Sequence, residues 1–185
     1  MLQETPTSTS TLVVRQDFTD EDLAGIYGRL RRDGSLETIF WMGVPSLTDF
    51  LGTYGTHNAA LLETVDEDGF HYPVGLGWVN STRRINLATE DRTVEVGFGI
   101  ARSCRGLRET LFFGRAVLRI AFEKSPHIIA CVGVTPQPNL GAVMFARLLG
   151  MNISGPIPNY ASWDGIPCGA YVSCMTRRAF YNGGQ

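Results

Sequence analysis

The sequence has little net charge and no long apolar run. Its 185 residues contain 16 Lys and Arg against 18 Asp and Glu, a formal net charge of −2. A balance this close to neutrality provides no overall attraction for a polyanion, so we expect neither nucleic acid nor a membrane as a partner. No uncharged apolar stretch approaches the ~18 residues of a membrane-spanning helix. The first eleven residues lack the basic and apolar regions of a signal peptide, so we expect a cytoplasmic protein.

Cysteine is scarce and is not arranged as a metal site. The four cysteines are Cys104, Cys131, Cys168 and Cys174. They contain no C-x-x-C pair, and no histidine lies near them at the spacing of zinc ligands, so we expect no metal. Three of them lie in apolar or strand-like segments, where a reduced cysteine acts as a small apolar side chain.

Motifs of nucleotide and hydrolytic enzymes are also missing. The sequence has no G-x-x-x-x-G-K-[ST] phosphate loop, and the glycines of "GFGIAR" (97–102) lie within an expected strand instead of a strand-to-helix turn. Three histidines are far apart, and no G-x-S-x-G sequence accompanies them. These absences disfavour dinucleotide-dependent and serine-hydrolase chemistry.

The composition is that of one folded domain. Hydrophobic residues make up 44% and charged residues 18% of the chain, and a chain of this length buries roughly two-thirds of its unfolded surface. We therefore expect residues 1–185 to form a single domain. Residues 1–11 are polar, and we expect them to be flexible.

The first half predicts helices followed by an antiparallel hairpin. Its expected elements are a strand at 12–16, a helix from Thr19 to Gly34, a weaker helix at 45–53, and strands at 58–65 and 71–80. Thr19 is a plausible N-cap because three acidic residues follow it in the first turn. The acidic turn "DEDG" between the two strands predicts a hairpin, after which a polar loop occupies 81–92.

The second half contains a strand, helix and strand in direct succession. Its expected elements are a strand at 93–101, a helix at 106–125, a strand at 127–134, a helix from Asn139 to Gly150, and two strands around the loop 154–166. A helix of this length between two strands is a right-handed crossover, which makes those strands parallel neighbours. The sequence therefore predicts an α+β fold with one parallel pair in a mostly antiparallel mixed sheet.

Two motifs in this half resemble the GNAT superfamily of acetyl-coenzyme A (acetyl-CoA) dependent N-acetyltransferases. "NLGAVMFARLLGM" (139–151) is similar to the N-x-x-[AS]-x-x-x-x-x-x-x-G-[FM] helix of the ribosomal-protein-acetylating type. "VEVGFGIARSCRG" (94–106) resembles the fourth strand of the family and the pyrophosphate turn after it. The resemblance implies a GNAT-like sheet of six to seven strands with about four helices.

The resemblance also implies positions for acetyl-CoA as cosubstrate. It assigns Phe98, Gly99, Ile100 and Ala101 to the pantetheine and acetyl groups, and Asn139 to the other side of the pantetheine arm. It assigns the turn from Cys104 to Thr110 to the pyrophosphate, with Arg105, Gly106, Leu107, Arg108 and Thr110 as its contacts. Physically, a helix N-terminus presents free N–H groups to phosphate, and the backbone of a splayed strand can bind an extended chain.

The turn departs from the family pattern [QR]-x-x-G-x-[GA]. With Gly106 as the central glycine, Ser103 stands at the first position and Arg108 at the last. Either Arg105 and Arg108 act as charged phosphate ligands, or the turn is closed by its own side chains, with Glu109 interacting with the helix dipole.

The catalytic groups are less clearly marked. Many family members have a Tyr where this chain has Ala146. Glu95 on the fourth strand is the family-like general base, although its alternation with valines could equally point it to solvent. Tyr160, in the loop 154–166 beside the acceptor site, is either the general acid or an ordinary packed aromatic residue. By resemblance, Trp41 or Tyr54 lines the acceptor pocket.

Two hypotheses on function follow. The first is an N-acetyltransferase that passes an acetyl group from acetyl-CoA to an amine by direct attack, as a monomer or homodimer. The second is a non-catalytic GNAT-fold module for binding or assembly, of the kind encoded by phages, that has lost acyl-CoA turnover. The incomplete turn and the missing Tyr favour the second, and the sequence does not identify the acceptor.

Overall fold

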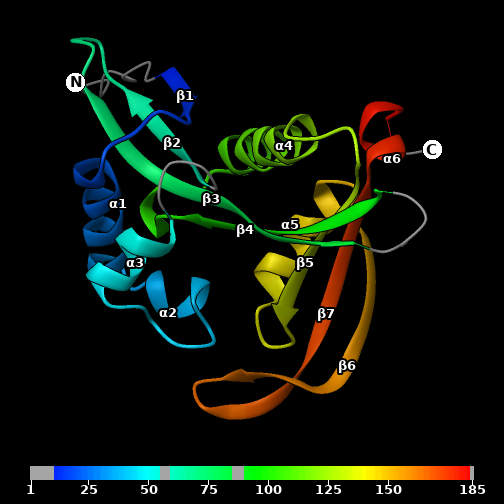
Figure 1. The fold of residues 1–185 in the computed structure, drawn as a ribbon. Helices are drawn as coiled ribbons and strands as arrows, with labels where there is room; N and C mark the ends of the chain where they lie inside the picture. Colours follow the sequence, from blue (N-terminus) through cyan, green and yellow to red (C-terminus); the bar gives the residue numbers. More distant parts are fainter. Residues whose placement is uncertain (1–10, 55–58, 85–89, 184–185) are drawn as a thin grey trace, which may run out of the picture.

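A seven-stranded mixed sheet forms the centre of the fold (Figure 1). The computed structural model describes residues 11–54, 59–84 and 90–183. The strands are β1 (Thr11–Arg15), β2 (Ala59–Val65), β3 (His71–Arg84), β4 (Arg92–Ile100), β5 (Ile128–Pro136), β6 (Asn152–Trp163) and β7 (Ile166–Thr176). The helices are α1 (Asp20–Arg32), α2 (Leu36–Ile39), α3 (Leu47–Thr53), α4 (Leu107–Glu123), α5 (Leu140–Leu148) and α6 (Arg177–Tyr181).

The strands lie in the order β1-β2-β3-β4-β5-β7-β6. The central pair β4 and β5 is parallel and is joined by α4, whereas the other pairs are antiparallel. The expected α+β class with one parallel pair is confirmed. The flexible segment expected at 1–11 falls outside the described residues except for Thr11, which begins β1. Within the described part, no helix is long and apolar enough to cross a membrane.

Helices cover both faces of this sheet. Leu61 and Leu62 are consecutive in β2 and therefore face opposite sides. Leu61 packs in one buried cluster with residues of α1, α2 and α3, whereas Leu62 packs with Phe113 of α4 in another. Ala146 of α5 shares a third cluster with Leu118 of α4. The helices α1 to α3 thus lie on one face and α4 and α5 on the other.

Helix α1 begins and ends at the residues expected from the sequence. The Oγ1 of Thr19 accepts a hydrogen bond from the backbone N–H of Asp22 (3.2 Å), and the Asp22 carboxylate accepts one from the backbone N–H of Thr19 (2.8 Å). This reciprocal pair satisfies two of the free donors of the first turn. Gly34, with φ of 67°, follows the last turn in the left-handed region that favours glycine.

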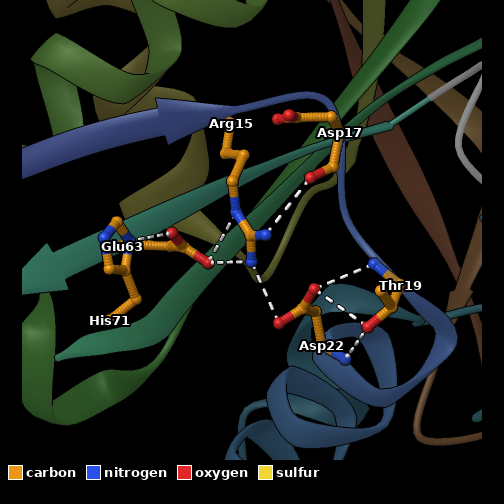
Figure 2. Close-up of polar contacts among 6 residues, drawn as sticks. All are labelled: Arg15, Asp17, Thr19, Asp22, Glu63 and His71. Carbon is orange, nitrogen blue, oxygen red and sulfur yellow. Dashed lines mark hydrogen bonds and ion pairs between the residues drawn. The ribbon is translucent and has the colours of Figure 1, made fainter.

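A charged cluster connects β1 to β2, β3 and α1 (Figure 2). The Glu63 side chain is fully buried, and Oε1 accepts hydrogen bonds from Nε (3.2 Å) and Nη2 (2.7 Å) of Arg15. Its Oε2 lies 2.8 Å from Nδ1 of His71, and Arg15 Nη2 lies 2.9 Å from the Asp22 carboxylate. Because a buried carboxylate is costly without a partner, these contacts fix β1 in its register beside β2.

Two loops expected from the sequence are strand over much of their described length. Of the polar loop expected at 81–92, residues 81–84 belong to β3, which pairs there with β4, and Arg92 begins β4; residues 85–89 lie outside the described residues. The loop expected at 154–166 is instead strand β6 with a turn after Trp163. β6 tolerates its prolines because it is an edge strand, where a missing N–H removes no pairing.

The chain ends in a short helix that was not expected from the sequence. β7 ends at Thr176, whose Oγ1 accepts a hydrogen bond from the backbone N–H of Ala179 (3.1 Å) and so begins α6. The Arg177 guanidinium donates to the backbone carbonyls of Phe122, Ser125 and Ile128. This side chain therefore holds α6 against the end of α4 and the start of β5. The short helix α2 was not expected either.

Candidate functional site

The parallel strands β4 and β5 separate halfway along their length. Their pairing runs from Arg92↔Ile128 to Glu95↔Val132 and stops there. Beyond this point β4 continues to Ile100 while paired only with β3, and β5 continues to Pro136 while paired only with β7. The facing edges of the two strands therefore present backbone groups without a strand partner.

A cavity of about 500 Å³ occupies this separation. Its walls come from α2, β3, β4, the first turn of α4 and the segment before it, β5, α5 and β7. The residues predicted from the sequence that line it are Glu95, Phe98, Gly99, Ile100, Arg105, Thr110 and Asn139. The fold thus brings residues from three separate segments of the chain to one hollow.

The other predicted residues lie elsewhere. Ala101 is fully buried, and Gly106 is the N-cap of α4. Arg108 is exposed in the first turn of α4, and the side chain of Leu107 lies outside the described part. Tyr160 lies on β6 and not in a loop, is 56% exposed, and is not among the described residues that line the cavity.

The cavity reaches both faces of the sheet because β4 alternates. Glu95, Gly97 and Gly99 face the side of α2 and α3. A Cβ on Gly97 would lie 2.2 Å from the Trp78 ring, and one on Gly99 would lie 2.5 Å from Cδ1 of Ile39. Phe98 faces the other side, where its ring meets Phe145 of α5 edge to face at 5.4 Å.

Glu95 lies on the α2 and α3 side of the cavity. Its side chain is exposed to solvent and also lines the cavity. The two alternatives left by the sequence, a position in the site and a position facing solvent, therefore coincide. Partial burial raises the pKa of Tyr54, and the negative charge of Glu95 raises it further. Tyr54 does not line the cavity but packs against Trp78 at 5.3 Å between ring centroids. Trp41, the other residue expected near an acceptor, does line the cavity.

Arg105 supports the end of β4. Its Nε donates to the backbone carbonyl of Ile100 (2.9 Å), and its Nη2 donates to Oγ of the fully buried Ser35 (3.1 Å). Desolvation lowers the pKa of this guanidinium below its usual value. Arg105 therefore joins the last residue of β4 to the segment before α2 while it lines the cavity.

The start of α4 carries a carboxylate of its own. Gly106 has no side chain to cap the helix, and a Cβ there would lie 1.9 Å from Oε2 of Glu109. The Glu109 carboxylate thus lies against the helix N-terminus, where the dipole favours negative charge. Thr110 Oγ1 donates to the Gly106 carbonyl (2.6 Å). An anion bound at this turn would compete with the Glu109 carboxylate for the N-terminus of α4.

Asn139 caps α5 at the opposite wall. Its Oδ1 accepts a hydrogen bond from the backbone N–H of Ala142 (3.3 Å), and it lines the cavity. Among the described residues, its side-chain nitrogen has no hydrogen-bond partner. Asn139 therefore presents a free donor beside the hollow.

Sequence reasoning missed several residues of this wall. Thr38, Ile39, Trp78 and Ser173 line the cavity although no motif contains them. Trp78 has a detectable signal, since it lies opposite Gly97 in the β3 and β4 register, and a large residue opposite a glycine is a common form of cross-strand packing. Across the described residues, no group of three or more His, Cys, Asp or Glu side chains is placed to hold a metal ion.

Solved acetyltransferases share this architecture. An acetyltransferase of the GNAT family from Bacillus anthracis superposes with a TM-score of 0.70 at 12% identity, over 91% of this chain and 97% of that chain. Spermidine N-acetyltransferase from Vibrio cholerae, in complex with CoA and spermine, gives 0.71 at 14% identity, over 92% and 98%. The fold is that of the GNAT acetyltransferases. A proposed acetyltransferase from Acinetobacter baylyi superposes with a TM-score of 0.71 at 20% identity, over 92% of this chain and 94% of that chain.

The sequence itself is distant from characterised families. No family model and no curated protein matches it. The GNAT fold is therefore established by the structure, and the chemistry of the site depends on the residues that this chain places in it.

Proposed function

We propose that the protein is an N-acetyltransferase that transfers the acetyl group of acetyl-CoA to an amine by direct attack. The separation of β4 and β5 carries this proposal, because it leaves an unpaired strand edge along a cavity that reaches both faces of the sheet. An extended chain such as pantetheine can bind a free strand edge through backbone hydrogen bonds. The structure of a protein with this fold in complex with CoA and spermine supports the choice of ligand and acceptor class.

The proposed contacts are those expected from the sequence, and six of them line the cavity: Phe98, Gly99, Ile100, Arg105, Thr110 and Asn139. Phe98 to Ala101 would bind the pantetheine and acetyl groups, with Asn139 on the opposite side. The segment from Arg105 to Arg108, with Thr110, would bind the pyrophosphate. The motif at Asn139 supports the ribosomal-protein-acetylating type as the nearest branch. Cytoplasmic location and a monomeric or homodimeric state stay predictions from the sequence.

Glu95 is the proposed general base. The amine would enter from the α2 and α3 face and transfer a proton to the Glu95 carboxylate. The nitrogen of the amine then bonds to the thioester carbonyl carbon, and backbone N–H groups of β4 stabilise the oxyanion that forms. The carbon–sulfur bond breaks, and CoA leaves as the thiolate, which takes up the second proton of the acetylated nitrogen and so leaves a neutral amide. The acid role of Tyr160 stays a prediction, which a Tyr160→Phe variant tests through its kcat.

The alternative is a GNAT-fold module that has lost acyl-CoA turnover. The position of the Glu109 carboxylate against the start of α4 is the observation that supports it. If Glu109 competes with the pyrophosphate, then Glu109→Gln should bind acetyl-CoA more tightly than the unaltered protein. An unchanged affinity would show that the carboxylate lies away from the ligand.

Calorimetric titration with acetyl-CoA tests the proposal. Binding to the folded state must also raise the melting temperature through mass action. We expect micromolar affinity that Arg108→Ala weakens, whereas Arg119→Ala, an exposed arginine further along α4, serves as the matched control. Absence of heat and of thermal stabilisation at millimolar ligand would overturn the enzyme proposal.

A further inference from the structure

A second hollow adjoins the first on the side where the amine would enter. It has a volume of about 320 Å³ and lies between residues 40–44 and the turn of the β6 and β7 hairpin. Figure 1 shows this hairpin extending past the rest of the sheet to lie below α2. Trp41 lines both hollows, so the second is continuous with the wall of the first.

The charged residues of the second hollow are all acidic. Glu37 and Asp164 line it, and no Lys, Arg or His is among its described lining residues. Neither carboxylate forms an ion pair or a side-chain hydrogen bond with another described residue. Glu95 is a third carboxylate, on the wall of the first hollow. A molecule that extends past Trp41 from one hollow to the other would therefore meet negative charge at both ends.

Between these charges the surface is aromatic and apolar. Phe40, Trp41 and Trp163 line the second hollow, and Met42, which also lines it, is 83% exposed. Aromatic faces attract cations. The combination suits an alkyl chain that ends in an ammonium group.

We infer that the acceptor is an alkyl diamine or polyamine, whose far ammonium binds between Glu37 and Asp164 while its near amine reaches Glu95. This inference rests on the proposed function, because it assigns the acceptor class of that same site. An acceptor with a carboxylate at its far end would be repelled by the two acids. The hollow thus acts as the specificity-determining part of the acceptor site.

The turn that carries Asp164 allows its charge to be removed without a change in backbone conformation. Asp164 has φ of 51° and Gly165 φ of 76°, and two positive values form the type I′ turn of a two-residue hairpin. Asparagine adopts this left-handed conformation as readily as aspartate. Asp164→Asn therefore removes the charge without strain on the turn.

The test compares 1,4-diaminobutane with n-butylamine, which has the same carbon chain but one charge fewer. We expect the unaltered protein to prefer the diamine in kcat/KM. Asp164→Asn and Glu37→Gln should each lower that preference roughly tenfold, the size of one charge-assisted contact, with little change for the monoamine. Glu123→Gln, an exposed acid at the end of α4, is the matched control. Equal kcat/KM values for the two amines would overturn the inference.

A direct titration separates this inference from the proposed function. 1,4-Diaminobutane is titrated calorimetrically into the protein without acetyl-CoA. Binding that Asp164→Asn weakens supports the cation site even if acetyl-CoA does not bind. Conversely, acetyl-CoA binding and n-butylamine acetylation without any preference for the diamine would refute the cation site and leave the acetyltransferase standing.

Discussion

At the scale of single residues, two glycines of β4 shape the site. Gly97 and Gly99 leave room on the α2 and α3 face for the Trp78 ring and the Ile39 side chain. Any side chain at these positions would push those residues away from the sheet. Since both neighbours line the cavity, the glycines determine the shape of the wall beside Glu95.

We predict that Gly97→Ala destabilises the protein. Its new Cβ would lie 2.2 Å from Cε2 and Cζ2 of Trp78, and overpacking of this kind costs about 1–3 kcal/mol. Gly25→Ala is the control, because the nearest heavy atom to its new Cβ is Cγ of Pro73 at 3.7 Å. An alanine within α1 should raise the free energy of unfolding by about 0.5–1 kcal/mol. Urea denaturation measures both, and equal effects would contradict the prediction.

Glu95→Gln should lower kcat and leave acetyl-CoA binding unchanged. Removal of a general base costs about 10²-fold or more in rate, whereas the Glu95 side chain lies on the face opposite the pantetheine contacts of Phe98 and Asn139. Steady-state kinetics gives kcat, and calorimetry gives the acetyl-CoA affinity of the same variant. A kcat within twofold of the unaltered protein would show that the base is another group.

Individual residues differ in how far the sequence predicts them. Asn139 was found because a helix N-cap and a family motif coincide there, and it does cap α5. Arg105 was expected either as a phosphate ligand or within a turn closed by its own side chains, and its guanidinium bonds to Ile100 and Ser35. The partner Ser35 is distant in sequence, so no local pattern reveals this contact.

At the scale of elements, periodicity predicted the centre of the fold well. The strand, helix and strand expected at 93–101, 106–125 and 127–134 are β4, α4 and β5 with small shifts at their ends. A helix of that length between two apolar strands has essentially one arrangement. By contrast, β6 contains proline and glycine, which predict a loop, and only its position at the sheet edge makes those residues compatible with a strand.

The start of α1 should make stability depend on acidic pH. Partial burial acts to raise the pKa of Asp22, but hydrogen bonds from Thr19 and Arg15 outweigh it and hold the pKa below its ordinary value of 3.8. A carboxyl whose pKa is lowered by folding contributes stability that is complete above the unfolded pKa and is lost as pH falls through the folded pKa. The contribution of Asp22 is therefore present at neutral pH and is lost below about pH 4.

Urea denaturation of Asp22→Asn at pH 7 and pH 3 tests this dependence. The variant should be less stable than the unaltered protein at pH 7, and the difference should shrink at pH 3. Glu67→Gln, an exposed acid outside the cluster of Figure 2, is the control and should show little difference at either pH. A difference for Asp22→Asn that is the same at both pH values would contradict the prediction.

At the scale of the whole molecule, the acceptor side is assembled from distant segments. Glu37 and residues 40–44 form one hollow with residues 162–165, although more than half of the chain separates the two segments. Each segment alone shows only ordinary aromatic and acidic residues. Their proximity follows from the length of the β6 and β7 hairpin, which the expected loop at 154–166 concealed.

Hydrogen exchange should locate acetyl-CoA within the molecule. We predict slower exchange of amides in residues 96–100 when acetyl-CoA is added, because the unpaired edge of β4 gains hydrogen bonds. Amides of β2, which is paired on both sides, should be unaffected. Uniform slowing throughout the sheet would indicate general stabilisation and would count against binding at this edge.

The separation of β4 and β5 also has a mechanical consequence. The sheet consists of two halves, β1 to β4 and β5 to β7. The strands of the two halves are paired only at the four register positions from Arg92↔Ile128 to Glu95↔Val132. With so few backbone pairs between them, the two halves are also held together by a buried cluster that includes Val94 of β4, Cys131 of β5 and Leu118 of α4. A ligand seated in the gap would contact both halves of the sheet. We therefore expect ligand binding to stiffen the molecule most along this line.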